Sequence, residues 1–324
     1  MVDFIYDRGV RLSGTDLWFD ARKKVNLSFM SSPNVSPIPR HERIIATPGT
    51  LGFIEGRTKN SVVLSCPYNR PFTLGNIRIE LIPSGYMLGS SQIVVEHNDK
   101  RIIYTGDLKL RYSPTADYIE LRRCDYLLIK CRYGISKYLF PPDKDTMKSI
   151  YEFVKESIYF GYIPVIIIEP YGKTQDLILY LLENKIQLSL HRSILNVVKV
   201  YEQSGFDFTG CSGININKLE GKVVMVPPQT RGSNLINKIR KKRVAAVMGW
   251  SLDIENEIKE VFDADFVFPL SNHAGYDELI QYIQITSPEK IFLLGTYSMQ
   301  FSRTLKNMGF DAIPLDTPKQ LKFF

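Results

Sequence analysis

The second half of the chain alternates strand-like and helix-like segments, and this alternation limits the folds that the sequence can adopt. Short apolar runs typical of buried strands lie at 165–168, 222–226, 244–248 and 290–294, with a short strand near Ala312. Segments with apolar residues at helical spacing lie before and between them, at 143–160, 173–183, 192–203, 274–285 and 299–308. Strands that alternate with helices in this way form largely parallel sheets covered by helices. The sequence therefore predicts an α/β fold.

The first part of the chain is instead rich in short β-like runs. Two of them, Ser91–Glu96 and Arg101–Tyr104, flank the turn-forming residues Asn98 and Asp99, which predicts a β-hairpin. The character of the sequence changes after Pro141 and Pro142, where Asp143 is placed to cap a helix.

Composition excludes several classes of protein. The 324 residues are 44% hydrophobic and 23% charged, as in ordinary globular proteins, and no apolar run is long enough to span a bilayer. The N-terminus lacks the pattern of a signal peptide. The four cysteines form no C-x-x-C pair, so we expect buried free thiols and a cytoplasmic location. The net charge of +7 gives a mild bias towards polyanions.

Several motifs follow one another in an informative order. Residues 85–92 read G-Y-M-L-G-S-S-Q, 105–107 read T-G-D, and 271–279 read S-N-H-A-G-Y-D-E-L. Tyr133-Gly134 and Gly249-Trp250 lie between the last two. This order resembles the β-CASP branch of the metallo-β-lactamase superfamily, which includes RNA 3′-end processing nucleases and DNA-ligase-associated exonucleases. The resemblance covers nearly the whole chain.

The resemblance implies a four-layer αββα metallo-β-lactamase sandwich with an inserted β-CASP α/β domain. We expect residues 1–140 to form the N-terminal part of the metallo-β-lactamase-like domain. Residues 141–276 would form the insert, and residues 277–324 would return to the first domain.

The metal-binding positions that the family would supply are largely lost. Two-metal hydrolysis requires imidazole and carboxylate ligands. The family motif H-x-H-x-D-H aligns with residues 32–37, and two further histidine positions align elsewhere. The degenerate positions are Ser32, Asn34, Ser36, Pro37, Tyr86 and Gly295. Of the direct ligands only Asp107 remains, so we expect the family's zinc to be absent and no metal or other cofactor to be bound.

The remaining polar residues each admit two interpretations. Asp107 is either a vestigial ligand or a carboxylate bonded to backbone amides in a turn. His273, which the family places near the scissile phosphate, could bind phosphate or cap the following helix. His41 and His191 are interpreted as surface or helix-start residues, and His97 as a strand-end residue. A metal site rebuilt from His41, His97 or His273 is the alternative.

Lys130 and Arg132 occupy the positions of the acidic residue and the threonine in the family's E-x-T-Y-G element. A charge reversal there would be costly beside two metal cations. These side chains either replace part of the lost positive charge or point to solvent.

Candidate nucleic-acid contacts come from charge and from the resemblance. Glu169 and the helix start at 172–175 resemble a family element, and helix N-termini attract anions. The densest basic run is 238–243. The candidates are Lys173, Arg231, Lys238, Arg240, Lys241, Lys242, Arg243 and His273. A solvated surface is the alternative for the basic run.

Three hypotheses follow for the function. The first is a catalytically inactive β-CASP nuclease-like protein, not an enzyme, that binds RNA or DNA or scaffolds an active nuclease or helicase. The second is an active metal-dependent phosphodiester hydrolase with a rebuilt site. The third is a protein-interaction subunit without nucleic-acid affinity. No membrane association is expected, and homodimers are compatible with the family.

Overall fold

The structure is a computed structural model that describes residues 3–34, 39–252 and 254–316. It divides into two compact units. Unit 1 comprises Met1–Ser136 together with His273–Phe324, and unit 2 comprises Lys137–Asn272. Unit 1 is therefore assembled from two separate stretches of the sequence, whereas unit 2 is continuous.

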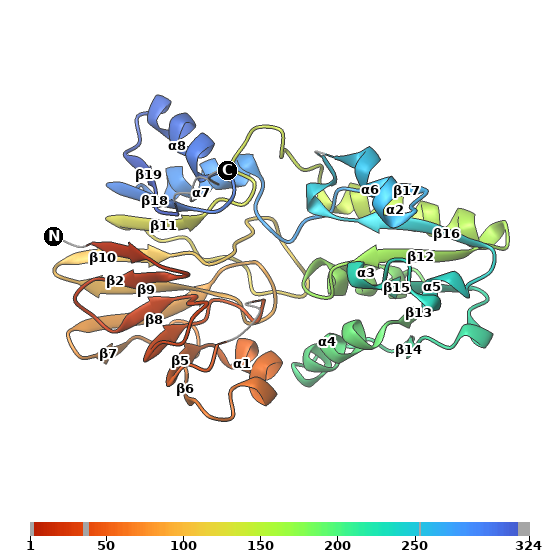
Figure 1. Ribbon diagram of the computed structural model, residues 1–324, viewed down its shortest axis with the longest axis horizontal. Coiled ribbons are helices and arrows are strands. Elements are labelled where there is room, and N and C mark those ends of the chain that lie inside the picture. The colour runs from red at the N-terminus through yellow and green to blue at the C-terminus, as the bar shows by residue number, and fades with distance from the viewer. Residues whose placement is uncertain (1–2, 35–38, 253, 317–324) are drawn as a thin grey trace, which may run out of the picture. The chain divides into compact units, whose positions relative to one another are not determined.

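The described residues of unit 1 form two sheets (Figure 1). The first sheet has the order β1 (Phe4–Tyr6), β2 (Val10–Leu12), β3 (Leu17–Phe19), β4 (Leu27–Phe29), β5 (Arg43–Ala46) and β6 (Val62–Ser65). The second has the order β19 (Ala312–Pro314), β18 (Lys290–Leu294), β11 (Tyr126–Lys130), β10 (Lys100–Tyr104), β9 (Ser91–His97), β8 (Ile77–Pro83) and β7 (Phe72–Leu74). The predicted hairpin is confirmed, because β9 and β10 pair antiparallel with His97 opposite Lys100.

The two sheets of unit 1 pack face to face around one apolar core. Phe19 and Phe29 from the first sheet and Val95, Ile102 and Tyr104 from the second belong to the same buried cluster. Because side chains alternate along a strand, the next residues point to the opposite face of each sheet. There the second sheet packs against α7 (Tyr276–Thr286) and α8 (Ser298–Asn307). On the first sheet the outer face packs against α1 (Pro48–Ile54), which is followed by a short 3-10 turn (Glu55–Arg57).

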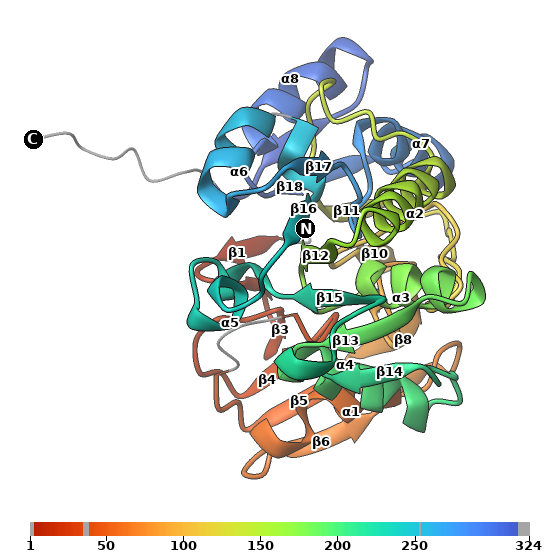
Figure 2. The same ribbon diagram turned by 90° about the vertical axis from the view of Figure 1, so that its right-hand side faces the viewer.

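Unit 2 is built on a parallel sheet (Figure 2). Its order is β14 (Cys211–Gly213), β13 (Gln187–Leu190), β15 (Lys222–Val226), β12 (Ile163–Ile168), β16 (Lys242–Val247) and β17 (Phe266–Phe268). Its α-helices are α2 (Asp143–Tyr159), α3 (Lys173–Glu183), α4 (Arg192–Gln203), α5 (Asn234–Asn237) and α6 (Glu255–Phe262). Short 3-10 turns lie at Ile216–Lys218, Pro228–Thr230 and Gly249–Leu252. The strand pairs that the structure describes in this sheet are all parallel, which confirms the predicted α/β class.

Two local predictions need correction. Asp143 does not cap α2, because Pro142 occupies the cap position and the Asp143 carboxylate instead forms an ion pair with Lys173 at 2.9 Å. His41 is not a surface residue, since only 2% of it is exposed. His191 does start a helix, because its ring nitrogen accepts a hydrogen bond from Ser193 N at the beginning of α4.

All four cysteines are free thiols, as predicted, and Cys66, Cys124 and Cys131 are buried whereas Cys211 is half-buried. None of the helices that the structure describes has both the length and the apolar character needed to cross a membrane.

Candidate functional site

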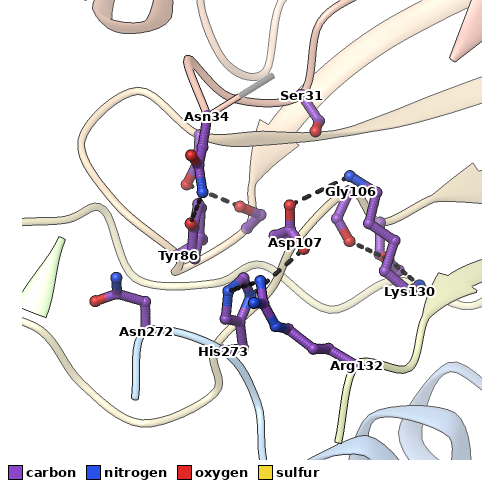
Figure 3. A network of polar contacts seen from close by, with 12 residues as sticks. Ser31, Asn34, Tyr86, Gly106, Asp107, Lys130, Arg132, Asn272 and His273 are labelled. Carbon is purple, nitrogen blue, oxygen red and sulfur yellow. Dashed lines mark hydrogen bonds and ion pairs between the residues drawn. The ribbon is translucent and has the colours of Figure 1, made fainter. Parts of the chain in front are cut away.

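Asp107, Lys130, Arg132 and His273, which the sequence analysis named, lie close together in unit 1 (Figure 3). Asp20 directly follows β3, Asp107 follows β10, and Lys130 ends β11. Gly106, between Thr105 and Asp107, has φ of 56°, and a Cβ atom there would lie 2.4 Å from Ser31 Cβ. The T-G-D sequence therefore needs its glycine to bring the Asp107 backbone close to Ser31, which lies just after β4.

Lys130 joins the two carboxylates. Its Nζ lies 2.7 Å from Asp20 Oδ2 and 3.2 Å from Asp107 Oδ2. Burial alone would lower the pKa of Lys130, but Asp107 and Asp20 outweigh this effect and raise that pKa well above its usual value. Lys130 is therefore a permanent cation inside the site. The alternative that it points to solvent is wrong.

Asp20 is held by further donors besides Lys130. Its Oδ1 accepts a hydrogen bond from Ser31 N at 2.8 Å, and its Oδ2 accepts from Ser31 Oγ and Tyr104 Oη, both at 2.7 Å. Asp20 and Tyr104 are both buried. The lone pairs of this carboxylate are largely used within the protein, so Asp20 is fixed in position.

Asp107 uses both of its oxygens in contacts with side chains. Oδ2 faces Lys130, and Oδ1 lies 3.4 Å from His273 Nδ1. Burial alone would raise the pKa of Asp107, but Lys130 and His273 hold it well below its usual range. The interpretation of Asp107 as a turn carboxylate bonded to backbone amides is therefore corrected, because its partners are these two side chains.

His273 lies between Asp107, Arg132 and Tyr86. Arg132 Nη1 lies 3.1 Å from His273 Nε2, so the ring proton lies on Nδ1, which faces Asp107. The ring stacks on Tyr86 with centroids 4.8 Å apart. Burial lowers the pKa of His273, although Asp107 acts in the opposite direction. The imidazole is therefore neutral near pH 7. It does not cap α7, since Gly275 holds that position.

Tyr86 occupies the position where the family would supply a histidine. Only 3% of it is exposed, and its hydroxyl accepts a hydrogen bond from Asn34 Nδ2 at 2.8 Å. Burial, and then the negative charge of Asp107, raise the pKa of Tyr86, so its phenol stays protonated. Two of the degenerate positions thus contact each other.

A cavity of about 680 Å³ opens beside these residues. Its wall includes four cationic side chains, those of Arg8, Arg22, Lys130 and Arg132. Asp20, Asp107 and Asp316 contribute carboxylates to the same wall. Because Lys130 is already paired with two of these, the guanidinium groups are the main remaining donors for an anionic ligand.

Comparison with known proteins shows that this sequence is similar to a probable DNA ligase and to ribonucleases. No protein-family model matches the sequence. The chain is 28% identical to a probable DNA ligase of Opitutus terrae over 99% of its own length, which is 32% of the length of that protein. It thus spans about a third of this relative. It is 24% identical to a probable RNase, MJ4, of Methanocaldococcus jannaschii over 78% of the chain and 69% of the relative. An endoribonuclease of Neurospora crassa, ysh-1, is 31% identical over 26% of the chain and 10% of its own length.

The names of these relatives are consistent with the β-CASP nuclease branch of the metallo-β-lactamase superfamily, which the sequence resembles. A solved structure also shares its fold, with a TM-score of 0.59 and 12% identity, over 85% of this chain and 76% of the other. That structure is a protein of unknown function from Enterococcus faecalis, so it informs the fold alone.

The residues of this chain do not fit the zinc centre that the β-CASP resemblance implies. The groups that could ligate a metal already face cations, because the Lys130 ammonium contacts Asp20 and Asp107, and the Arg132 guanidinium lies 3.1 Å from His273 Nε2. Across residues 3–34, 39–252 and 254–316, no group of three His, Cys, Asp or Glu side chains is placed to hold a metal ion. Divalent metals prefer carboxylate and imidazole ligands and are repelled by ammonium groups.

The other degenerate positions are less informative. The Ser32 hydroxyl is buried with no hydrogen-bond partner, and Gly295 donates its backbone N–H to Asp316 at 2.5 Å. Ser36 and Pro37 lie outside the described residues.

Lys173 is a corrected prediction. It was a candidate phosphate contact, but its side chain is 5% exposed and its Nζ lies 2.7 Å from Asp176 and 2.9 Å from Asp143. Asn272 Oδ1 accepts a hydrogen bond from Lys173 N, so this helix start is already capped by a side chain. Neither the ammonium nor this amide is available to a phosphate.

The remaining basic candidates belong to unit 2. Arg231, Lys238, Arg240 and Lys241 are exposed, whereas Lys242 and Arg243 are half-buried. Arg243 is used within the fold, because it forms an ion pair with Glu156 at 3.2 Å and covers the ring of Phe266. Their role in nucleic-acid binding stays a prediction.

Sequence reasoning missed several residues of the cavity, among them Arg8 and Tyr104. Arg8 gave no signal, because it precedes a glycine in a polar stretch without a motif. Tyr104 was assigned only to a strand, although it comes directly before T-G-D and its hydroxyl reaches Asp20. The motif next to it could have directed attention to Tyr104.

Proposed function

We propose that this chain is a catalytically inactive β-CASP nuclease-like protein that binds RNA or DNA without cutting it. One observation carries the proposal. Both oxygens of Asp107, the last candidate metal ligand, face side chains of the chain itself, Lys130 on one side and His273 on the other. An ammonium in an ion pair with this carboxylate opposes the entry of a divalent cation, whose charge it would repel.

The proposal includes an assignment of the two units to the two domains that the resemblance implies. We assign unit 1 as the metallo-β-lactamase sandwich and unit 2 as the inserted β-CASP domain. The support is the packing order of unit 1, in which α1 covers one sheet and α7 and α8 cover the other. The parallel sheet of unit 2 is consistent with the second assignment.

DNA is the first ligand to test. The relative that matches 99% of this chain is named a probable DNA ligase, while those that match smaller shares are named as ribonucleases. An active nuclease or a helicase is the kind of partner that such a protein would scaffold, and the name of this relative adds a DNA ligase. Residence in the cytoplasm belongs to this proposal as well.

A second candidate is an active nuclease with a rebuilt metal site, since His273 does lie 3.4 Å from Asp107. The deciding experiment incubates the purified chain with labelled single-stranded and duplex DNA and RNA, with added zinc or manganese and with chelator. We expect binding without cleavage in every condition. Metal-dependent cleavage that Asp107→Ala abolishes would overturn the proposal, and cleavage that survives this substitution would identify a contaminating nuclease.

A further inference from the structure

The turn between α2 and β12 carries an exposed aromatic cluster. Tyr159, Phe160 and Tyr162 are 84%, 61% and 42% exposed. Large aromatic side chains are usually buried or half-buried, because their apolar area is costly to hydrate. Three exposed rings within four residues therefore indicate a surface that is covered by a ligand.

The backbone holds this turn in a defined conformation. Phe160 N donates to Glu156 O at 3.1 Å, and Tyr162 N donates to Ser157 O at 2.9 Å. Gly161 provides the left-handed residue that the turn needs, with φ of 73°. The rings of Tyr159 and Phe160 contact each other edge to face, with centroids 5.2 Å apart. A ligand would thus meet rings that project from an ordered backbone.

Basic residues lie beside the turn. Ile163 N, at the start of β12, donates to Lys241 O at 2.8 Å, and Ile163 pairs with Lys242 of β16 (Figure 1). The end of the basic run is therefore adjacent to the aromatic turn through backbone pairing. On the other side of β12 lies β15, which begins at Lys222. Because the sheet is parallel, these strand starts share one edge.

Two carboxylates that contact Arg243 and Val244 are engaged there. Glu156 forms its ion pair with Arg243, and Asp265 Oδ2 accepts a hydrogen bond from Val244 N at 2.7 Å. Lys238, Arg240 and Lys241 are exposed beside them. The edge thus presents aromatic rings next to positive charge.

We propose that this edge of unit 2, formed by Tyr159, Phe160, Tyr162, Arg240 and Lys241, binds single-stranded nucleic acid. Bases of a single strand stack on exposed aromatic rings, and its phosphates contact cationic side chains. A duplex hides the faces of its bases, so it would use only the charges. Positive charge favours a polyanion over an apolar protein segment as the occupant. The inference rests on the proposed nucleic-acid binding but uses none of the residues around Asp107.

The first test measures the affinity of the full chain for a labelled oligothymidylate by fluorescence anisotropy. The variant carries Tyr159→Ala, Phe160→Ala and Tyr162→Ala together. We expect its affinity to fall by about tenfold or more, because each stacked base contributes to binding. The matched control carries Tyr112→Ala and Tyr118→Ala, which remove tyrosines that are 70% and 64% exposed in unit 1. The control should bind like the wild type, and since all five side chains are exposed, both variants should keep the wild-type melting temperature.

The second test concerns the charges. Arg240→Ala with Lys241→Ala should weaken binding and reduce the magnitude of the slope of log affinity against log salt concentration by about 1. The control, Arg303→Ala with Lys306→Ala, removes two exposed charges from α8 and should leave the slope unchanged.

The outcomes separate the inference from the proposed function. Binding by the aromatic variant at wild-type affinity would overturn the inference and leave the proposed function standing. A wild-type chain that binds no nucleic acid at all would overturn the proposed function. If the aromatic substitutions abolish self-association and leave oligonucleotide binding intact, the edge is a protein interface and the inference is wrong.

Discussion

The Nζ atom of Lys130 lies 3.2 Å from Asp107 Oδ2, so the last carboxylate of a nuclease-type motif forms an ion pair with an internal lysine. Asp20 shares the same ammonium at 2.7 Å. Lys130 stands at the position where the E-x-T-Y-G element of the resembled family has an acidic residue. The substitution thus changes an acidic position into a fixed internal cation, and the two carboxylates depend on it.

Lys130→Met tests this dependence. Removal of the ammonium leaves Asp20 and Asp107 with a net negative charge in a largely buried position, so we expect the free energy of unfolding of the chain to fall by about 3 kcal/mol. Denaturant unfolding provides the measurement. The double variant Lys130→Met with Asp107→Asn should recover part of the loss, because one uncompensated charge is removed. A single variant as stable as the wild type would show that Lys130 contributes no net stabilisation.

Tyr86 is expected to act mainly through its ring. Its side chain is buried and stacks on His273, while its hydroxyl makes one hydrogen bond to Asn34, which is exposed. Tyr86→Ala should therefore cost about 3 kcal/mol of the free energy of unfolding through the cavity that it leaves. Tyr86→Phe, the matched control, should cost about 1 kcal/mol or less. Equal losses in the two variants would assign the stabilising role to the hydroxyl instead.

His41 gives a pH dependence whose sign can be derived. Burial lowers the pKa of this imidazole below its usual value. The unfolded chain therefore takes up a proton at a higher pH than the folded chain does, and stability falls as pH drops below about 6.5. The variant His41→Leu cannot titrate, so its stability should fall less between about pH 7 and pH 5. The lowered pKa of His273 adds a slope of the same sign, so some dependence should persist. Parallel pH profiles for wild type and variant would contradict this assignment.

A chelator should not destabilise the chain. A metal ion that bound the native state would raise its melting temperature by mass action, and chelation would reverse the effect. Because Lys130 supplies the positive charge between the carboxylates, we expect the melting temperature to change by less than about 1 °C when excess chelator is added. A drop of several degrees that added zinc restores would reveal a metal site and support the rebuilt nuclease.

The elements of unit 2 could be predicted because their signals are local. The predicted helices at 173–183 and 192–203 match α3 and α4, and the predicted strand at 222–226 matches β15. Strands of three residues such as β2 were not predicted, since so short a segment carries almost no periodic signal. These strands are defined by pairing with neighbours and by packing against the second sheet.

The chemistry of the site was harder to predict because it depends on contacts between distant positions. Lys130 meets Asp20 across 110 positions of the sequence, and His273 meets Arg132 across 141. The family resemblance identified Lys130, Arg132 and His273 but left the direction of the Lys130 side chain open. Lys173 shows the opposite error, because a lysine at a helix start indicates an anion site until its two carboxylate partners, Asp143 and Asp176, are known.

The strand order of unit 1 has a consequence for how the chain folds during synthesis. β11 pairs with β18, and β18 is made only after all of unit 2 has been translated. Unit 2 is continuous in the sequence, so its sheet can close while the second sheet of unit 1 still lacks β18 and β19. Until then the partly made sheet ends at β11 with an unpaired apolar edge, which is open to aggregation or to capture by a chaperone. We therefore expect unit 2 to fold first on the ribosome and unit 1 to complete only near the end of translation.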